Sequence, residues 1–261
     1  MKSTSLAVAL LGTMLIAGAA QAQSVAVLVG DDTIAVVDIA GKRVGASMKM
    51  SGLSGKLLGI DVRPADGLLY GLVGDGTIVT IDPASGKATQ KSKLDVMLPS
   101  GVIATVDFNP VADRLRVIGS DGTNLRANVD DGKVTKDGQL KFADNDMHKG
   151  KAPKIVAGAY TNAMKGAKET TLYDIDATGA LVKQVPPNEG VLNSIGMIGM
   201  TAETAAFDIV AETTGQGMNT GWLMAGDSLY KVDLATGKAS SVGKITGVSG
   251  SVRDIAALPM K

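Results

Sequence analysis

A short motif, an aspartate between apolar residues, recurs along the chain at nearly constant spacing. Four copies are centred on Asp61, Asp107, Asp208 and Asp254, and a fifth copy carries Ala159 at the same place. Successive centres lie 46, 52, 49 and 46 residues apart. Self-similarity with a period of roughly 20–50 residues is typical of architectures in which each repeat is one small supersecondary unit. The repeat therefore constrains the fold more strongly than any local pattern.

Within each repeat, the sequence predicts short antiparallel strands joined by tight turns. After the Asp61 motif comes the alternating run 68–73, then a turn at 74–76, then a second alternating run at 77–82. Alternation with a period of two, bounded by Asp-Gly or Thr-Gly pairs, indicates strands and hairpins. The 33 glycines agree with this prediction, because many tight turns need the positive φ that glycine adopts freely. We expect units of four antiparallel strands.

The two ends of the chain together supply one further repeat. Residues 25–38 match the second and third strands of a unit, and residues 252–258 match a first strand with nothing after it. Residues 254–261 and 23–61 together give a fifth interval of 46. A unit shared between the termini is typical of a closed propeller, which protects its strand edges. We predict an all-β fold, a five-bladed β-propeller closed by a blade shared between N- and C-terminal strands. The alternatives are six or seven blades, or an open β-repeat array.

Residues 1–22 have the pattern of a cleavable signal peptide. Lys2 precedes an apolar stretch at 6–17, and Ala20-Gln21-Ala22 provides the small residues of a cleavage site. The apolar stretch is shorter than the ~20 residues that cross a bilayer, and we expect no membrane span elsewhere. The sequence therefore predicts an exported protein, periplasmic or extracellular, with one propeller domain over residues 23–261.

Composition excludes several classes of chemistry. The chain has no cysteine and one histidine, His148. It therefore lacks disulfides, thiolate metal sites, a cysteine nucleophile and any site that needs two histidines from one chain. The 26 basic and 26 acidic residues balance, so no basic surface for nucleic acid is expected.

Several segments resemble one bacterial family. They are Leu57-Leu58-Gly59-Ile60-Asp61-Val62-Arg63-Pro64-Ala65, Val106-Asp107-Phe108-Asn109-Pro110, Asp113-Arg114-Leu115-Arg116-Val117, Thr123-Asn124-Leu125-Arg126, Thr171-Leu172-Tyr173-Asp174-Ile175-Asp176, Pro186-Pro187-Asn188 and Leu229-Tyr230-Lys231-Val232-Asp233-Leu234-Ala235-Thr236-Gly237. Together they are similar to the family known as domain of unknown function 4394, over about residues 25–258. The resemblance implies an exported, propeller-like protein. It implies no activity and assigns no catalytic residue.

The repeated aspartates are the main candidates for chemistry. If they lie on the innermost strands, their carboxylates approach a central channel from several sides, where they could gather a divalent cation or a ligand bearing amines or hydroxyls. The candidate binding residues are these aspartates and two polar residues on the same strand faces: Asp61, Arg63, Asp107, Asn109, Asp208 and Asp254. The alternative is structural, with each aspartate accepting backbone N–H bonds from a neighbouring blade. Repetition in four of five blades favours this structural role.

Three arginines form a second candidate site. Arg114 and Arg116 share one strand face, and Arg126 falls on the next predicted strand. Three guanidinium groups together could bind an anion. The alternative is that they form salt bridges with Asp113 and Asp121 on a solvated face.

Three function classes follow from these features. We expect a binding or interaction module for an unknown ligand or protein, a monomer without a cofactor other than a possible divalent cation of unknown identity. One alternative is a carboxylate-dependent glycan hydrolase or lyase, with or without assistance from a cation, since such enzymes need two nearby carboxylates. Another is a structural cell-surface protein. The eight aromatic residues and the lack of a histidine pair favour binding over catalysis.

Overall fold

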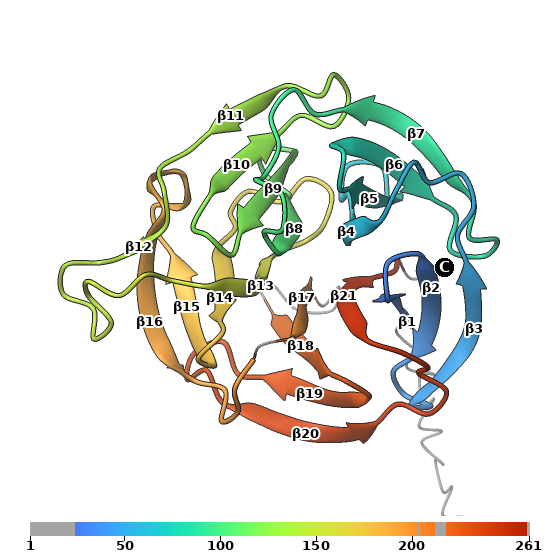
Figure 1. The fold of residues 1–261 in the computed structure, drawn as a ribbon. Coiled ribbons are helices and arrows are strands. Elements are labelled where there is room, and N and C mark those ends of the chain that lie inside the picture. Colours follow the sequence, from blue (N-terminus) through green and yellow to red (C-terminus); the bar gives the residue numbers. More distant parts are fainter. Residues whose placement is uncertain (1–23, 203, 212–217, 260–261) are drawn as a thin grey trace, which may run out of the picture.

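Five small β-sheets stand around a common centre in the computed structural model, which describes residues 24–202, 204–211 and 218–259 (Figure 1). Each sheet is one blade, and the blades follow one another in chain order. The protein is therefore a five-bladed β-propeller, as the repeat predicted, rather than a larger propeller or an open array. The predicted signal peptide, residues 1–22, lies outside the described residues.

The blades share one strand order, which runs from the innermost strand outward. Blade 1 is β21-β1-β2-β3, formed by Val252–Ala257, Ser24–Val29, Thr33–Asp38 and Arg43–Lys49. Blade 2 is β4-β5-β6-β7, formed by Leu57–Val62, Leu69–Val73, Thr77–Ile81 and Ala88–Lys93. Blade 3 is β8-β9-β10-β11, formed by Ala104–Asn109, Arg114–Gly119, Asn124–Ala127 and Val134–Lys136. Blade 4 is β13-β14-β15-β16-β12, formed by Ile155–Tyr160, Leu172–Asp176, Ala180–Gln184, Val191–Met197 and Lys141–Phe142. Blade 5 is β17-β18-β19-β20, formed by Ala206–Ala211, Asn219–Ala225, Ser228–Val232 and Ala239–Lys244.

The ring closes through blade 1, which combines both ends of the described chain. β21 pairs antiparallel with β1, so that Val27 lies opposite Ile255 and Ala26 lies opposite Ala256. The prediction of a blade shared between N- and C-terminal strands is confirmed. Innermost strands of successive blades also pack against one another all the way around the ring.

Asp-Gly turns connect strands within the blades, as the sequence indicated. Asp75 accepts a hydrogen bond from the amide of Thr77 at 2.9 Å, while Gly76 has a φ of 87°. The same arrangement recurs where Asp121 accepts from the amide of Thr123 at 3.0 Å. A side chain at such a positive φ is strained, so glycine is needed at the turn. The turns thereby set the register of each hairpin.

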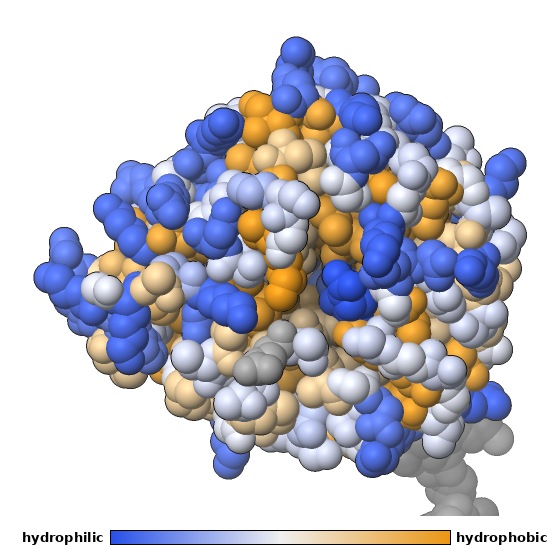
Figure 2. Space-filling model, in the orientation of Figure 1, coloured by the Kyte–Doolittle hydropathy of each residue, from blue (hydrophilic) through white to orange (hydrophobic). Residues whose placement is uncertain are grey.

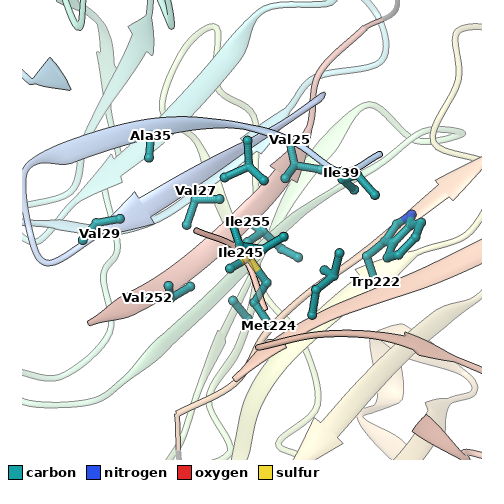
Figure 3. Close-up of a cluster of buried hydrophobic side chains, with 13 residues drawn as sticks. Val25, Val27, Val29, Ala35, Ile39, Trp222, Met224, Ile245, Val252 and Ile255 are labelled. Carbon is teal, nitrogen blue, oxygen red and sulfur yellow. The ribbon is translucent and has the colours of Figure 1, made fainter. Parts of the chain in front are cut away.

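The hydrophobic core lies between neighbouring blades. Figure 3 shows the cluster between blades 1 and 5, where Val25, Val27 and Ile255 face Met224 and Trp222. Such side chains contribute about 1.5–3 kcal/mol each when fully buried. Because one of the packed blades contains both ends of the described chain, this cluster also stabilises ring closure.

Two local features depart from regular four-stranded blades. In blade 4 the short strand β12 lies parallel to β16, which adds a fifth strand. A 3₁₀ turn, Pro187–Glu189, connects β15 to β16.

No helix among the described residues is long and apolar enough to cross a membrane. Figure 2 shows one face of the molecule, which is hollowed at its centre with hydrophobic and hydrophilic residues side by side around the hollow.

Candidate functional site

Three of the repeat aspartates converge at the centre of the ring. Asp61 on β4, Asp107 on β8 and Asp208 on β17 each place a carboxylate oxygen within 4.8 Å of the other two. Their exposed fractions are 8%, 6% and 5%, so all three are buried. We call these three residues the central acidic cluster. Asp254, on β21, is not one of the three.

The fold positions these side chains through the unpaired edges of the innermost strands. Each innermost strand pairs with one neighbour only, which leaves N–H groups on its inner edge without a ladder partner. Each repeat aspartate accepts such an N–H from the next blade: Asp61 from Phe108 at 2.6 Å, Asp107 from Tyr160 at 2.9 Å, Asp208 from Ala257 at 2.6 Å, and Asp254 from Ile60 at 2.9 Å. These bonds are the structural role that the sequence left as an alternative.

The cluster nevertheless retains unused acceptor capacity. Asp61 and Asp208 each accept a second N–H, from the residue that follows them in the chain, at 2.6 Å. Among the described residues, Asp107 accepts only the bond from Tyr160, which goes to one of its two oxygens. Thr105 precedes Asp107 by two residues and therefore shares its strand face; its hydroxyl is buried and has no partner within the described part of the chain. A ligand with hydrogen-bond donors could satisfy these groups.

Burial and mutual repulsion alter the acidity of the cluster. Burial, reinforced by the neighbouring charge of Asp208, raises the pKa of Asp61 well above its usual range. Burial and the charges of Asp61 and Asp208 do the same to the pKa of Asp107. Burial also raises the pKa of Asp208, and it raises the pKa of Asp254 to about 8. Carboxylates this close together must share protons or attract a cation.

A cavity of about 370 Å³ opens next to the cluster, with Asp61 and Asp208 in its wall. It lies at the carboxyl ends of β4, β17 and β21. Most of its other lining residues are apolar, including Met164, Val210 and Leu258. A ligand in this cavity can therefore reach two of the three carboxylates while contacting apolar side chains.

The two polar residues predicted beside the aspartates serve other contacts. Arg63 is buried, and its guanidinium lies between blades 2 and 3, where it binds Asp113 at 2.6 and 2.8 Å and Asp130 at 2.8 and 3.1 Å. Asn109 accepts the amides of Val111 and Ala112 in the turn after β8. Neither side chain is among the residues lining the cavity.

The three arginines of the second candidate site have protein partners. Arg116 is 2% exposed and donates to Asp137 at 2.6 Å; Arg126 donates to both oxygens of the same carboxylate, at 2.6 and 2.9 Å. The carboxylate of Asp137 therefore lies between Arg116 and Arg126, where a bound anion would lie. The sequence had predicted Asp113 and Asp121 as the partners of these arginines. Arg114 instead donates to the backbone carbonyl of Asp113 at 2.8 Å. Asp137 lies in the connection that follows β11. The spacing of strands along the sequence does not predict where the side chains of a connection lie.

Sequence reasoning missed Ser194, which joins Asp146 and His148. The hydroxyl of Ser194 lies 2.9 Å from Nδ1 of His148 and donates to Asp146 at 2.9 Å. The carboxylate lies 3.5 Å from the same ring nitrogen. A catalytic triad needs its serine and its acid on opposite nitrogens of the imidazole. The arrangement therefore orients a loop and lacks the geometry of a nucleophilic site.

The chain is similar to solved structures and to one family model. A protein of unknown function from Bacteroides thetaiotaomicron VPI-5482 superposes with a TM-score of 0.55 at 16% identity, over 92% of this chain and 65% of that one. Another, from Bacteroides caccae, gives a TM-score of 0.48 at 11% identity, over 91% and 99%. No curated protein matches the chain. Residues 34–256 match the model of a family described as Domain of unknown function (DUF4394). Because that match spans most of the propeller, the chain belongs to the DUF4394 family.

Proposed function

We propose that the protein is an exported binding module whose ligand places a positively charged group at the central acidic cluster. One observation carries this proposal: three buried carboxylates lie within 4.8 Å of one another beside a cavity of about 370 Å³. The signal peptide predicted at residues 1–22 supports binding in the periplasm or outside the cell.

Electrostatics supports a cationic ligand. Without a cation, the raised pKa values of Asp61, Asp107 and Asp208 mean that these groups hold protons which isolated carboxylic acids would lose. A bound cation replaces those protons and stabilises the ionised form. Affinity therefore increases with pH, because protons and ligand compete for the same carboxylates.

The same geometry favours binding over hydrolysis. In glycoside hydrolases, one carboxyl of the pair typically stays protonated as the acid while the other stays ionised as base or nucleophile. Here burial shifts the pKa of all three carboxyls in one direction, upward. Among the described residues that line the cavity, no aromatic side chain offers a surface on which a sugar ring could stack.

A calorimetric titration with a panel of cations tests the proposal. The panel contains Ca²⁺, Mg²⁺, methylammonium and hexylammonium, and each is titrated at pH 6 and pH 8. We expect at least one cation to bind, more tightly at pH 8, and to lose affinity in the Asp208→Asn variant.

Asp254→Asn is the matched control. Asp254, like Asp208, accepts one amide of its own strand and one of the next blade, so both substitutions disturb the ring similarly. Only Asp208 belongs to the central acidic cluster. If no cation binds, or if both variants lose affinity equally, the proposal is wrong.

A further inference from the structure

We propose that the positively charged group is a primary ammonium carried on an apolar body; this inference rests on the proposed function and specifies its ligand. Two features of the described residues lead to it. The first is the number and spacing of the acceptors in the central acidic cluster. The second is the apolar character of the cavity and of the loops around it.

The acceptors match the donors of a primary ammonium. Such a group has three N–H donors, which form hydrogen bonds of about 2.7–3.2 Å. Tetrahedral geometry then separates the three acceptor oxygens by about 4.5–5 Å. The three carboxylates provide oxygens within 4.8 Å of one another, and Asp107 still has an oxygen free of hydrogen bonds from the described residues. An ammonium held against Asp61 and Asp208 at the cavity wall would therefore also lie within reach of the free oxygen of Asp107, behind that wall.

The cavity walls suit an apolar chain. Of the 14 described residues that line it, only Asp61, Asp208 and Lys165 are ionisable. Met164 lines the cavity and is 40% exposed, so part of its apolar surface is available to a ligand. Lys165 lies on the same wall, so a second positive charge on the ligand would be repelled there.

The loops that follow innermost strands extend the apolar surface. Because every blade repeats one strand order, the described residues of these loops lie on one face of the ring. Four exposed hydrophobic residues come from four of them: Leu68, Val111, Met164 and Met218, with exposed fractions between 40% and 55%. Met164 also lines the cavity, so a ligand body that extends from the cavity meets exposed apolar surface on this face.

A calcium ion fits this environment less well. Calcium takes six to eight oxygen ligands. Here each oxygen of Asp61 and Asp208 already accepts one backbone N–H group, which leaves one acceptor position on each oxygen, and apolar residues dominate the rest of the wall. An ammonium needs only three acceptors, and its alkyl chain gains from the apolar contacts.

The test compares ligands that differ in one property at a time. Hexylammonium is titrated against methylammonium, trimethylhexylammonium, hexane-1,6-diammonium, hexanol and Ca²⁺. We expect hexylammonium to bind at least tenfold more tightly than each of the others, since burial of a methylene contributes up to about fourfold in affinity. The quaternary analogue lacks N–H donors, hexanol lacks charge, and the diammonium carries a second charge.

Variants separate the two parts of the site. Asp208→Asn should abolish hexylammonium binding, with Asp254→Asn as its control. Met164→Ala should weaken hexylammonium at least threefold and leave methylammonium unchanged; because Met164 is exposed, this variant keeps the fold. Met147→Ala, at an exposed residue that does not line the cavity, should change neither.

The outcomes distinguish this inference from the function on which it rests. Binding of Ca²⁺ alone, or equal binding of the quaternary analogue, overturns the primary ammonium while the cation-binding module stands. Equal binding of hexanol and hexylammonium overturns both, because charge is then not recognised. Failure of every ligand to bind also overturns both.

Discussion

Replacing Asp174 with asparagine should change how the stability of the protein depends on pH. Asp174, on β14, has no exposed surface, and neither of its carboxylate oxygens has a partner among the described residues. Gly158 lies opposite it on β13, where a larger residue would collide with the carboxylate. Burial raises the pKa of Asp174 from 3.8 to about 8, although the charge of Arg116 acts in the opposite direction.

The sign and size of the effect follow from this shift. The native state keeps a proton that the unfolded chain releases near pH 4, so the contribution of Asp174 to stability is greatest at low pH and falls as pH rises toward 8. Each pH unit in that window costs about 1.4 kcal/mol, or about 3 kcal/mol between pH 5 and pH 7. The asparagine side chain of the variant cannot ionise. The stability of Asp174→Asn relative to the natural protein should therefore rise by about 3 kcal/mol over the same interval.

Urea unfolding at pH 5, 6, 7 and 8 measures this difference. Trp222 is the only tryptophan and is buried, so its fluorescence reports unfolding. Other acidic groups are common to both proteins and cancel. Asp144→Asn, at a fully exposed side chain, should leave the pH dependence unchanged. If the difference in stability between the two proteins stays constant from pH 5 to pH 8, Asp174 is ionised in the native state and its pKa is not raised.

Two further substitutions test the contacts between strands and blades. Arg116→Met removes one of the cations that flank the buried Asp137, and we expect it to lower the free energy of unfolding by about 3 kcal/mol. Urea unfolding measures this loss, and a value below about 1 kcal/mol would contradict a buried ion pair. Gly132→Ala brings a Cβ into collision with the carbonyl of Lys93 in the neighbouring blade, whereas Gly150→Ala, also at positive φ, meets open space. Thermal unfolding should therefore show a lower midpoint for the first, and equal midpoints would show that positive φ alone determines the cost.

The repeat period determined the number of blades, because each unit of about 47 residues must bury its strands against its neighbours. The split unit likewise predicted the pairing of β21 with β1. Alternation along a strand also placed the repeat aspartates on equivalent faces. These properties depend on local pattern and chain length, which a sequence displays directly.

The tertiary structure decided what each side chain contacts. Only it shows that Asp61, Asp107 and Asp208 converge while Asp254 does not belong to the same cluster. Only it shows that Arg63 binds carboxylates of the next blade instead of joining the aspartates. These contacts join residues that are far apart in the chain, and they depend on loop conformations and rotamers. A periodic pattern places a residue on a face, but the partner on the opposite face is set by how neighbouring blades pack.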